Sequence, residues 1–174
     1  MKPVKKILAL ILAGVMALAL LTGCGKATSL NRTIAEGLAE QTKSALAQLG
    51  NDNNISVSYQ VPELRRDIAP LFDENWITKD NSGKDALTEA AKKTLANILS
   101  PYNSTVGVNF VATDVTDVKT PSLEVSNLAY SDIAFRTADP STFDASSITS
   151  MKIEVTHKTV NGRTYALAVM IAES

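Results

Sequence analysis

Hydrophobic positions along this chain change their spacing from one stretch to the next, and each spacing predicts an element. From Leu30 to Leu49, apolar residues recur every three or four positions, while the positions between them are polar or charged. That period matches one face of an α-helix, with Ser29 or Thr28 as its N-cap and Gly50 as its end. We expect this amphipathic helix to pack on the core.

In the next segment, apolar and polar residues alternate at every second position. Ile55 to Val61 alternates apolar and polar residues, which is typical of a strand with one polar face. Pro62 favours the start of a short helix, and Pro70 kinks or ends it. Trp76 is the only tryptophan, and we expect it to cover the core rather than to form a ligand platform.

A second clear helical stripe runs from Leu87 to Leu99. Ser82 and Asp85 have the spacing of a capping box, so the helix is expected to begin there. Ser100-Pro101 ends it.

The remainder reads mainly as strands. Asn161-Gly162 is the strongest short hairpin signal in the chain, because both turn positions require a positive φ. The arm that follows is apolar on both faces, so it should be central or covered on both sides. The expected strands are 106–112, a weaker one at 123–135, and the hairpin arms 151–160 and 163–172, with a polar loop at 138–150.

Helices precede antiparallel strands in this order, which predicts the α+β class: N-terminal helices packed on an antiparallel sheet that ends in a C-terminal β-hairpin. The length favours one domain, here residues 30–174.

The first residues follow a different pattern. Lys2, Lys5 and Lys6 precede the apolar run from Ile7 to Leu21. A basic segment before an apolar run of this length is typical of a secretory signal peptide. Fifteen apolar residues are short for a membrane-spanning helix, which needs about 20.

The run ends Leu21-Thr22-Gly23-Cys24. This ending resembles the lipobox of bacterial lipoproteins, in which an aliphatic residue and two small residues precede a cysteine. The resemblance implies that diacylglycerol is attached to the thiol of Cys24. It also implies that a signal peptidase recognises Leu21, Thr22 and Gly23 and removes residues 1–23. Residues 24–29 would then be the lipidated cysteine and a short tether.

Two acyl chains suffice for stable anchoring, so the expected partner is the lipid bilayer, on the extracytoplasmic side of the cell membrane. Gly25 replaces the aspartate that retains some Gram-negative lipoproteins in the inner membrane. The five residues from Gly25 to Ser29 reach at most about 17–18 Å. The residues after Gly23 carry 14 basic and 18 acidic side chains, a net charge of −4, which argues against a nucleic-acid partner.

Few residues suggest chemistry, since the chain has one histidine and one cysteine. A catalytic base at His157 would need an orienting carboxylate and a nucleophile, and Glu154 points to the opposite face of the predicted strand. We therefore expect His157 to be satisfied or at the surface, and we predict no catalytic residue, no metal ligand and no cofactor.

Several charged segments have simpler interpretations. Asp80 to Asp85 resembles part of a calcium loop, but Lys84 and Ala91 stand where ligands would be required, so a turn and helix cap is expected. Asp114 and Asp117 are expected to be solvated turn residues rather than cation ligands. The basic doublets are expected on solvated faces rather than at an anion site; they are Arg65-Arg66 and Lys92-Lys93.

A further resemblance concerns the segment Leu87 to Lys93 and the hairpin around Asn161-Gly162. Both are similar to bacterial CAP (cysteine-rich secretory protein-like) domains, which implies an α-β-α sandwich. The cavity of those domains uses two histidines and acidic partners. This chain has a single histidine, so no site residue is carried over, and the resemblance implies a degenerate member without that cavity.

These observations predict a membrane-anchored lipoprotein whose small, non-catalytic domain binds an envelope protein, a glycan or a small ligand. The alternative is a cell-envelope hydrolase whose carboxylates converge from distant segments. A two-lobed solute-binding protein ranks lower, because the chain is short for two lobes.

Overall fold

A computed structural model describes residues 30–174 except 60, 73, 103–106, 131–133 and 137–143. Cys24, the three residues before it and the rest of the leader lie outside the described residues. None of the helices in the described ranges combines the length and the apolar character needed to cross a membrane.

The described residues form helices and strands in mixed order. The α-helices are α2 (Leu30–Gln48), α3 (Pro62–Ile68), α4 (Glu89–Ile98) and α5 (Pro121–Tyr130). Single 3₁₀ turns are η2 (Glu74–Trp76), η3 (Ser100–Tyr102) and η5 (Ala145–Ser147). The strands are β1 (Ser56–Tyr59), β2 (Ile77–Lys79), β3 (Asp85–Leu87), β4 (Gly107–Asp114), β5 (Ala134–Arg136), β6 (Ser150–Val160) and β7 (Arg163–Glu173).

A five-stranded sheet in the order β1-β6-β7-β4-β5 is the centre of the fold, and β2 and β3 form a separate small hairpin. β6 and β7 pair antiparallel over their whole length. Asn161 and Gly162 join them with φ of 50° and 78°, so the predicted hairpin turn is confirmed. β7 lies third among the five strands, which confirms the expectation drawn from its two apolar faces.

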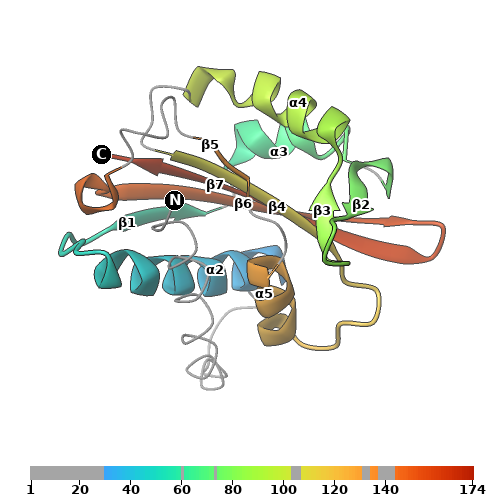
Figure 1. The fold of residues 1–174 in the computed structure, drawn as a ribbon, viewed down its shortest axis with the longest axis horizontal. Helices are drawn as coiled ribbons and strands as arrows, with labels where there is room; N and C mark the ends of the chain where they lie inside the picture. Colours follow the sequence, from blue (N-terminus) through green and yellow to red (C-terminus); the bar gives the residue numbers. More distant parts are fainter. Residues whose placement is uncertain (1–29, 60, 73, 103–106, 131–133, 137–143) are drawn as a thin grey trace.

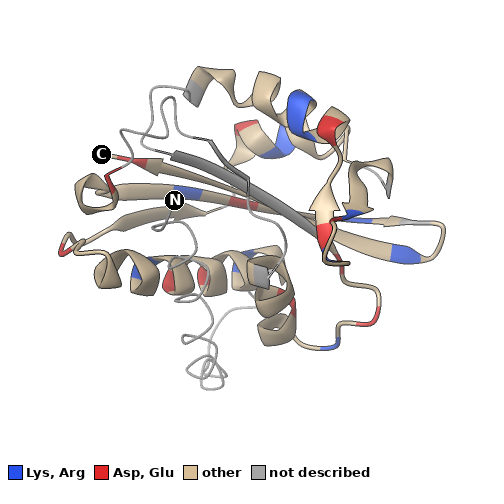
Figure 2. Ribbon diagram, in the orientation of Figure 1, with Lys and Arg blue, Asp and Glu red and all other residues tan. Residues whose placement is uncertain are grey.

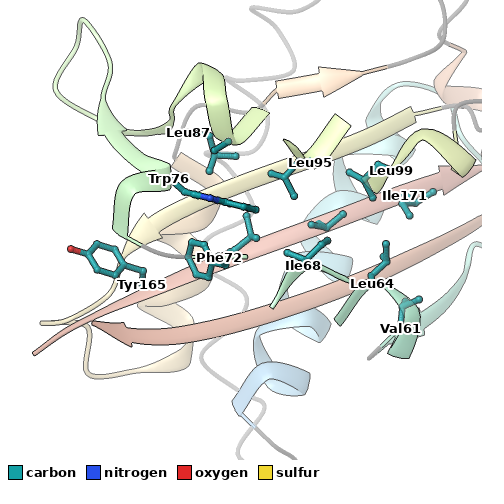
Figure 3. Packing of buried hydrophobic residues seen from close by; sticks show 13 residues of the cluster. Val61, Leu64, Ile68, Phe72, Trp76, Leu87, Leu95, Leu99, Tyr165 and Ile171 are labelled. Carbon is teal, nitrogen blue, oxygen red and sulfur yellow. The ribbon is translucent and has the colours of Figure 1, made fainter. Parts of the chain in front are cut away.

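Helices cover both faces of this sheet, giving three layers (Figure 1). Helices α3 and α4 pack on one face, and the side chains between them and β7 form the cluster shown in Figure 3. Helices α2 and α5 pack on the other face, against β6 and β7. The α+β class is therefore confirmed. Basic and acidic residues are interspersed over both helical layers (Figure 2).

The sheet differs from the expectation in one respect. It is mixed rather than wholly antiparallel, because β1 runs parallel to β6, with Val57 opposite Met151. The alternation that predicted β1 carries no information about its partner or direction. A parallel pair needs a long crossover, and about ninety residues separate these strands.

The predicted strand at 123–135 is wrong over most of its length, where the chain forms α5. Pro121 occupies the first turn, and the hydroxyl of Thr120 accepts a hydrogen bond from the backbone of Leu123. Val125 and Leu128 are three positions apart and both buried, as on one face of a helix. Among the described residues of the range, only Ala134 and Phe135, which belong to β5, are extended.

The start of the second long helix is also corrected. Asp85–Leu87 is strand β3, and the N-cap of α4 is Thr88, whose Oγ1 accepts a hydrogen bond from the Ala91 backbone N–H at 3.2 Å. Leu87 is buried in the same core as α4 although it precedes the helix. Trp76 is 9% exposed and meets Phe72 edge to face at 5.8 Å, so its predicted core position is confirmed.

The crossing of α2 and α5 yields the first testable prediction. A Cβ added at Gly37 would lie 2.7 Å from a methyl group of Val125, closer than real contacts allow. We expect Gly37→Ala to lower the free energy of unfolding by about 1–3 kcal/mol through overpacking. Chemical denaturation measures the loss, with Ser44→Ala on the exposed side of α2 as the matched control. Combining Gly37→Ala with Val125→Ala should recover part of it; a Gly37→Ala variant as stable as wild type would contradict the close crossing.

Candidate functional site

His157 is the centre of a polar cluster that joins three elements. It projects from β6 toward α2 and α5, on the same face as Ile153 and Val155. Its Nδ1 lies 2.7 Å from Oδ1 of Asn31, in the first turn of α2. Its Nε2 contacts Oε1 of Glu124, in the first turn of α5. The side chains of His157 and Glu124 are 16% and 6% exposed, so this contact is largely shielded from water.

The local sequence explains how the cluster forms. Glu124 stands in the first helical turn of α5, where a carboxylate interacts favourably with the partial positive charge of the helix N-terminus. It also lies one position before the buried Val125, so it is drawn toward the sheet together with the apolar face. A buried carboxylate requires a donor, and the imidazole of His157 provides one.

This arrangement is better suited to stabilising the fold than to catalysis. Both ring nitrogens of His157 face an oxygen, so neither is open toward a bound substrate. A base needs one nitrogen for its orienting partner and the other for the proton that it takes. The prediction of a satisfied histidine is confirmed. Glu124 was missed as its partner because its segment was predicted to be a strand.

A second buried carboxylate lies on the opposite face of the sheet. Glu154 of β6 is 2% exposed, and its Oε1 accepts a hydrogen bond at 2.7 Å from Nε of Arg65 in α3. Burial raises the pKa of Glu154 above its ordinary value of 4.5, although the Arg65 guanidinium opposes the rise. Oε2 has no hydrogen-bond partner among the described residues.

The Arg65-Arg66 doublet therefore divides. Arg65 is exposed, as predicted of a solvated face, but its guanidinium also pairs with the buried Glu154. The sequence did not reveal this pairing, because Glu154 belongs to a strand nearly ninety residues later. Arg66 is exposed and pairs with its chain neighbour Asp67, as expected of a solvated face. Lys92 pairs with Glu89 on the outside of α4.

The carboxylates of the acidic segments are hydrogen-bonded to other residues of the chain. Oδ1 of Asp80 accepts hydrogen bonds from the backbone N–H groups of Ser82 and Lys84, so the predicted turn is confirmed, while the helix cap is not. Asp114 is not a solvated turn residue as predicted; it is the last residue of β4, partly buried, and its carboxylate accepts hydrogen bonds from Thr116 and Arg163. Burial opposes ionisation of Asp114, but these hydrogen bonds outweigh it and hold its pKa below the ordinary value. Across the described part of the chain, no three histidine, cysteine or acidic side chains are grouped closely enough to hold a metal ion.

Gln41 is a buried polar residue whose side-chain amide makes no hydrogen bond among the described residues. It is 7% exposed in α2, and neither atom of its amide has a hydrogen-bond partner among the described residues. Burying an unpaired amide is unfavourable, so Gln41→Leu is expected to raise the free energy of unfolding by about 1–2 kcal/mol. Denaturant titration measures the gain, with the exposed Gln48→Leu of the same helix as control. A destabilised Gln41→Leu variant would show that the amide has a partner.

Comparison with protein-family models, with curated proteins and with solved structures finds no match for this chain. The function is therefore inferred from the residues and their geometry.

Proposed function

We propose that this chain is a membrane-anchored bacterial lipoprotein with a small, non-catalytic extracytoplasmic domain for binding or envelope interaction. The observation that carries the proposal is the sequence Leu21-Thr22-Gly23-Cys24, directly after a basic segment and an apolar run. Only a thiol forms the thioether to diacylglycerol, and the two acyl chains hold a protein on a membrane without crossing it.

The position of the folded part agrees with this proposal. The first described helix, α2, begins at Leu30, six positions after Cys24. Cleavage before Cys24 would leave every helix and strand that the structure describes in the mature protein.

The polar clusters favour binding over hydrolysis. Paired-carboxylate hydrolysis of a glycan needs two carboxyl groups about 5–10 Å apart across a substrate. Among the residues whose burial the structure describes, the buried glutamates are Glu124 and Glu154, which lie on opposite faces of the sheet, and each has a cationic or imidazole partner. They cannot act on one bond together.

A degenerate CAP-like domain is the second candidate. Helices on both faces of a sheet that closes with a β-hairpin form the α-β-α layering that the resemblance implies (Figure 1). No residue role follows from it, since the paired histidines of those domains have no counterpart in a chain with one histidine.

Metabolic labelling tests the anchor. Cells that express the full chain and grow with an alkyne-tagged fatty acid should yield a tagged protein, and Cys24→Ser should carry no tag. Tagging of both variants, or of neither, would contradict the lipoprotein assignment.

An assay of enzymatic turnover tests whether the domain is non-catalytic. We expect the acylated protein in detergent to release no fragments from cell-wall glycan or peptide. Release that Glu154→Gln or Glu124→Gln abolishes, with the fold retained, would replace this proposal by the hydrolase.

A further inference from the structure

Two exposed leucines stand at the same end of the domain. Leu30 and Leu123 are 49% and 50% exposed, while the cores of both helical layers are buried. Each leucine is the chain neighbour of a residue in the His157 cluster: Leu30 precedes Asn31, and Leu123 precedes Glu124. Because both neighbours contact one imidazole, the first turns of α2 and α5 lie close together at this end.

The tether to Cys24 leaves from the same end. Gly25 to Ser29 reach at most about 17–18 Å, and they join α2 at Leu30. Helix α2 has 19 residues and is therefore about 28 Å long. If its Gln48 end rested on the membrane, Leu30 would be lifted beyond the reach of the tether.

The opposite helical layer is disfavoured in the same way. With α3 and α4 on the bilayer, a helix about 10–12 Å thick and a sheet layer of about 10 Å would separate α2 from the lipid. The six steps from Cys24 to Leu30 span at most about 20–22 Å, so this orientation would require a fully extended tether. The orientation with the N-terminal turns of α2 and α5 toward the bilayer leaves the tether slack.

We propose that this end of the domain, defined by Leu30 and Leu123, rests on the bilayer that holds the acyl chains and inserts both leucines among the lipids. The inference depends on the anchor proposed above and adds the orientation of the domain. Apolar insertion drives the contact, since the nearby loop carries Asp117 and Lys119, both exposed and opposite in charge. The acyl chains already hold the domain at the membrane, so the two leucines need only orient it.

Single-thiol labelling tests the orientation. The one native cysteine, Cys24, is consumed by its thioether, so an introduced cysteine is the only free thiol of the acylated chain. Leu123→Cys is labelled with a small fluorophore and reconstituted in phosphatidylethanolamine and phosphatidylglycerol vesicles that contain a nitroxide lipid with a shallow quencher. Leu71→Cys is the matched control, since Leu71 is 47% exposed but follows α3 in the opposite layer.

The label at position 123 is expected to lose fluorescence in nitroxide vesicles, and the label at 71 to keep it. Leu30→Cys should behave as Leu123→Cys and guards against a local defect at one site. Equal quenching at 71 and 123, or stronger quenching at 71, overturns the orientation.

Flotation of the same vesicles separates the two proposals. Labelled protein that floats while position 123 stays unquenched refutes the orientation and leaves the anchor standing. Protein that fails to float, or that floats equally well when Cys24→Ala is added, refutes the anchor and the orientation with it.

Discussion

Arg65→Met is expected to lower the free energy of unfolding at pH 7 by about 2–3 kcal/mol. The variant leaves Glu154, 2% exposed, without the guanidinium that binds its Oε1. Breaking a fully buried ion pair removes about 3–5 kcal/mol, and we expect less here because the Arg65 side chain is 44% exposed.

The pH dependence identifies the cause. Burial raises the pKa of Glu154 in the folded protein, so the fold binds this proton more tightly than the unfolded chain does. Ionisation of Glu154 therefore lowers stability as the pH rises from 4.5 through the raised pKa, and Arg65 limits that loss. Removing Arg65 raises this pKa further, so the effect of Arg65→Met should be full only above the pKa of Glu154 in the variant and should shrink as the pH falls toward the wild-type pKa.

Two variants control this prediction. Arg66→Met removes an arginine that is 73% exposed and paired only locally, so it should change stability by less than about 0.5 kcal/mol. Adding Glu154→Gln to Arg65→Met should recover much of the loss, because no buried charge remains. Equal losses for Arg65→Met and Arg66→Met would contradict the role assigned to the buried pair.

His157→Leu is expected to lower the free energy of unfolding by about 2–4 kcal/mol, because it strands the carboxylate of Glu124 beneath α5. The loss should be felt first in α5, which the imidazole joins to β6 and α2. Hydrogen exchange in the native state should show α5 amides opening more readily, while α4 on the opposite face is little affected.

The double variant His157→Leu with Glu124→Leu is the control. Replacing both members of a buried pair by apolar groups is often close to neutral, so the double variant should be more stable than His157→Leu alone. A double variant less stable than the single one would show that the carboxylate has another partner.

Much of this fold could be predicted from signals that lie within short stretches of the sequence. The positive φ of Asn161-Gly162, the three-and-four spacing from Leu30 and the two apolar faces of β7 all act within a few residues. Each can therefore be read from neighbours in the chain, and each element formed as predicted.

What the sequence did not reveal depends on contacts between distant segments. Glu124 was assigned to a strand, and its value as a buried partner appears only when α5 folds against β6. The parallel direction of β1 likewise depends on its pairing with β6, about ninety positions later. The ion pair of Arg65 with Glu154 spans a similar distance along the chain. Periodicity identifies a buried face, but it does not identify what that face meets.

We propose that Cys24 carries the lipid that holds this domain at a membrane. The intact mass of the full chain, extracted from the membrane fraction of a bacterium beside Cys24→Ala, tests this proposal. We expect a mass of residues 24–174 plus acyl chains, and we expect the variant to lose both the acyl mass and its partition into the membrane. An unmodified, soluble protein would contradict it and would leave Cys24 a free thiol.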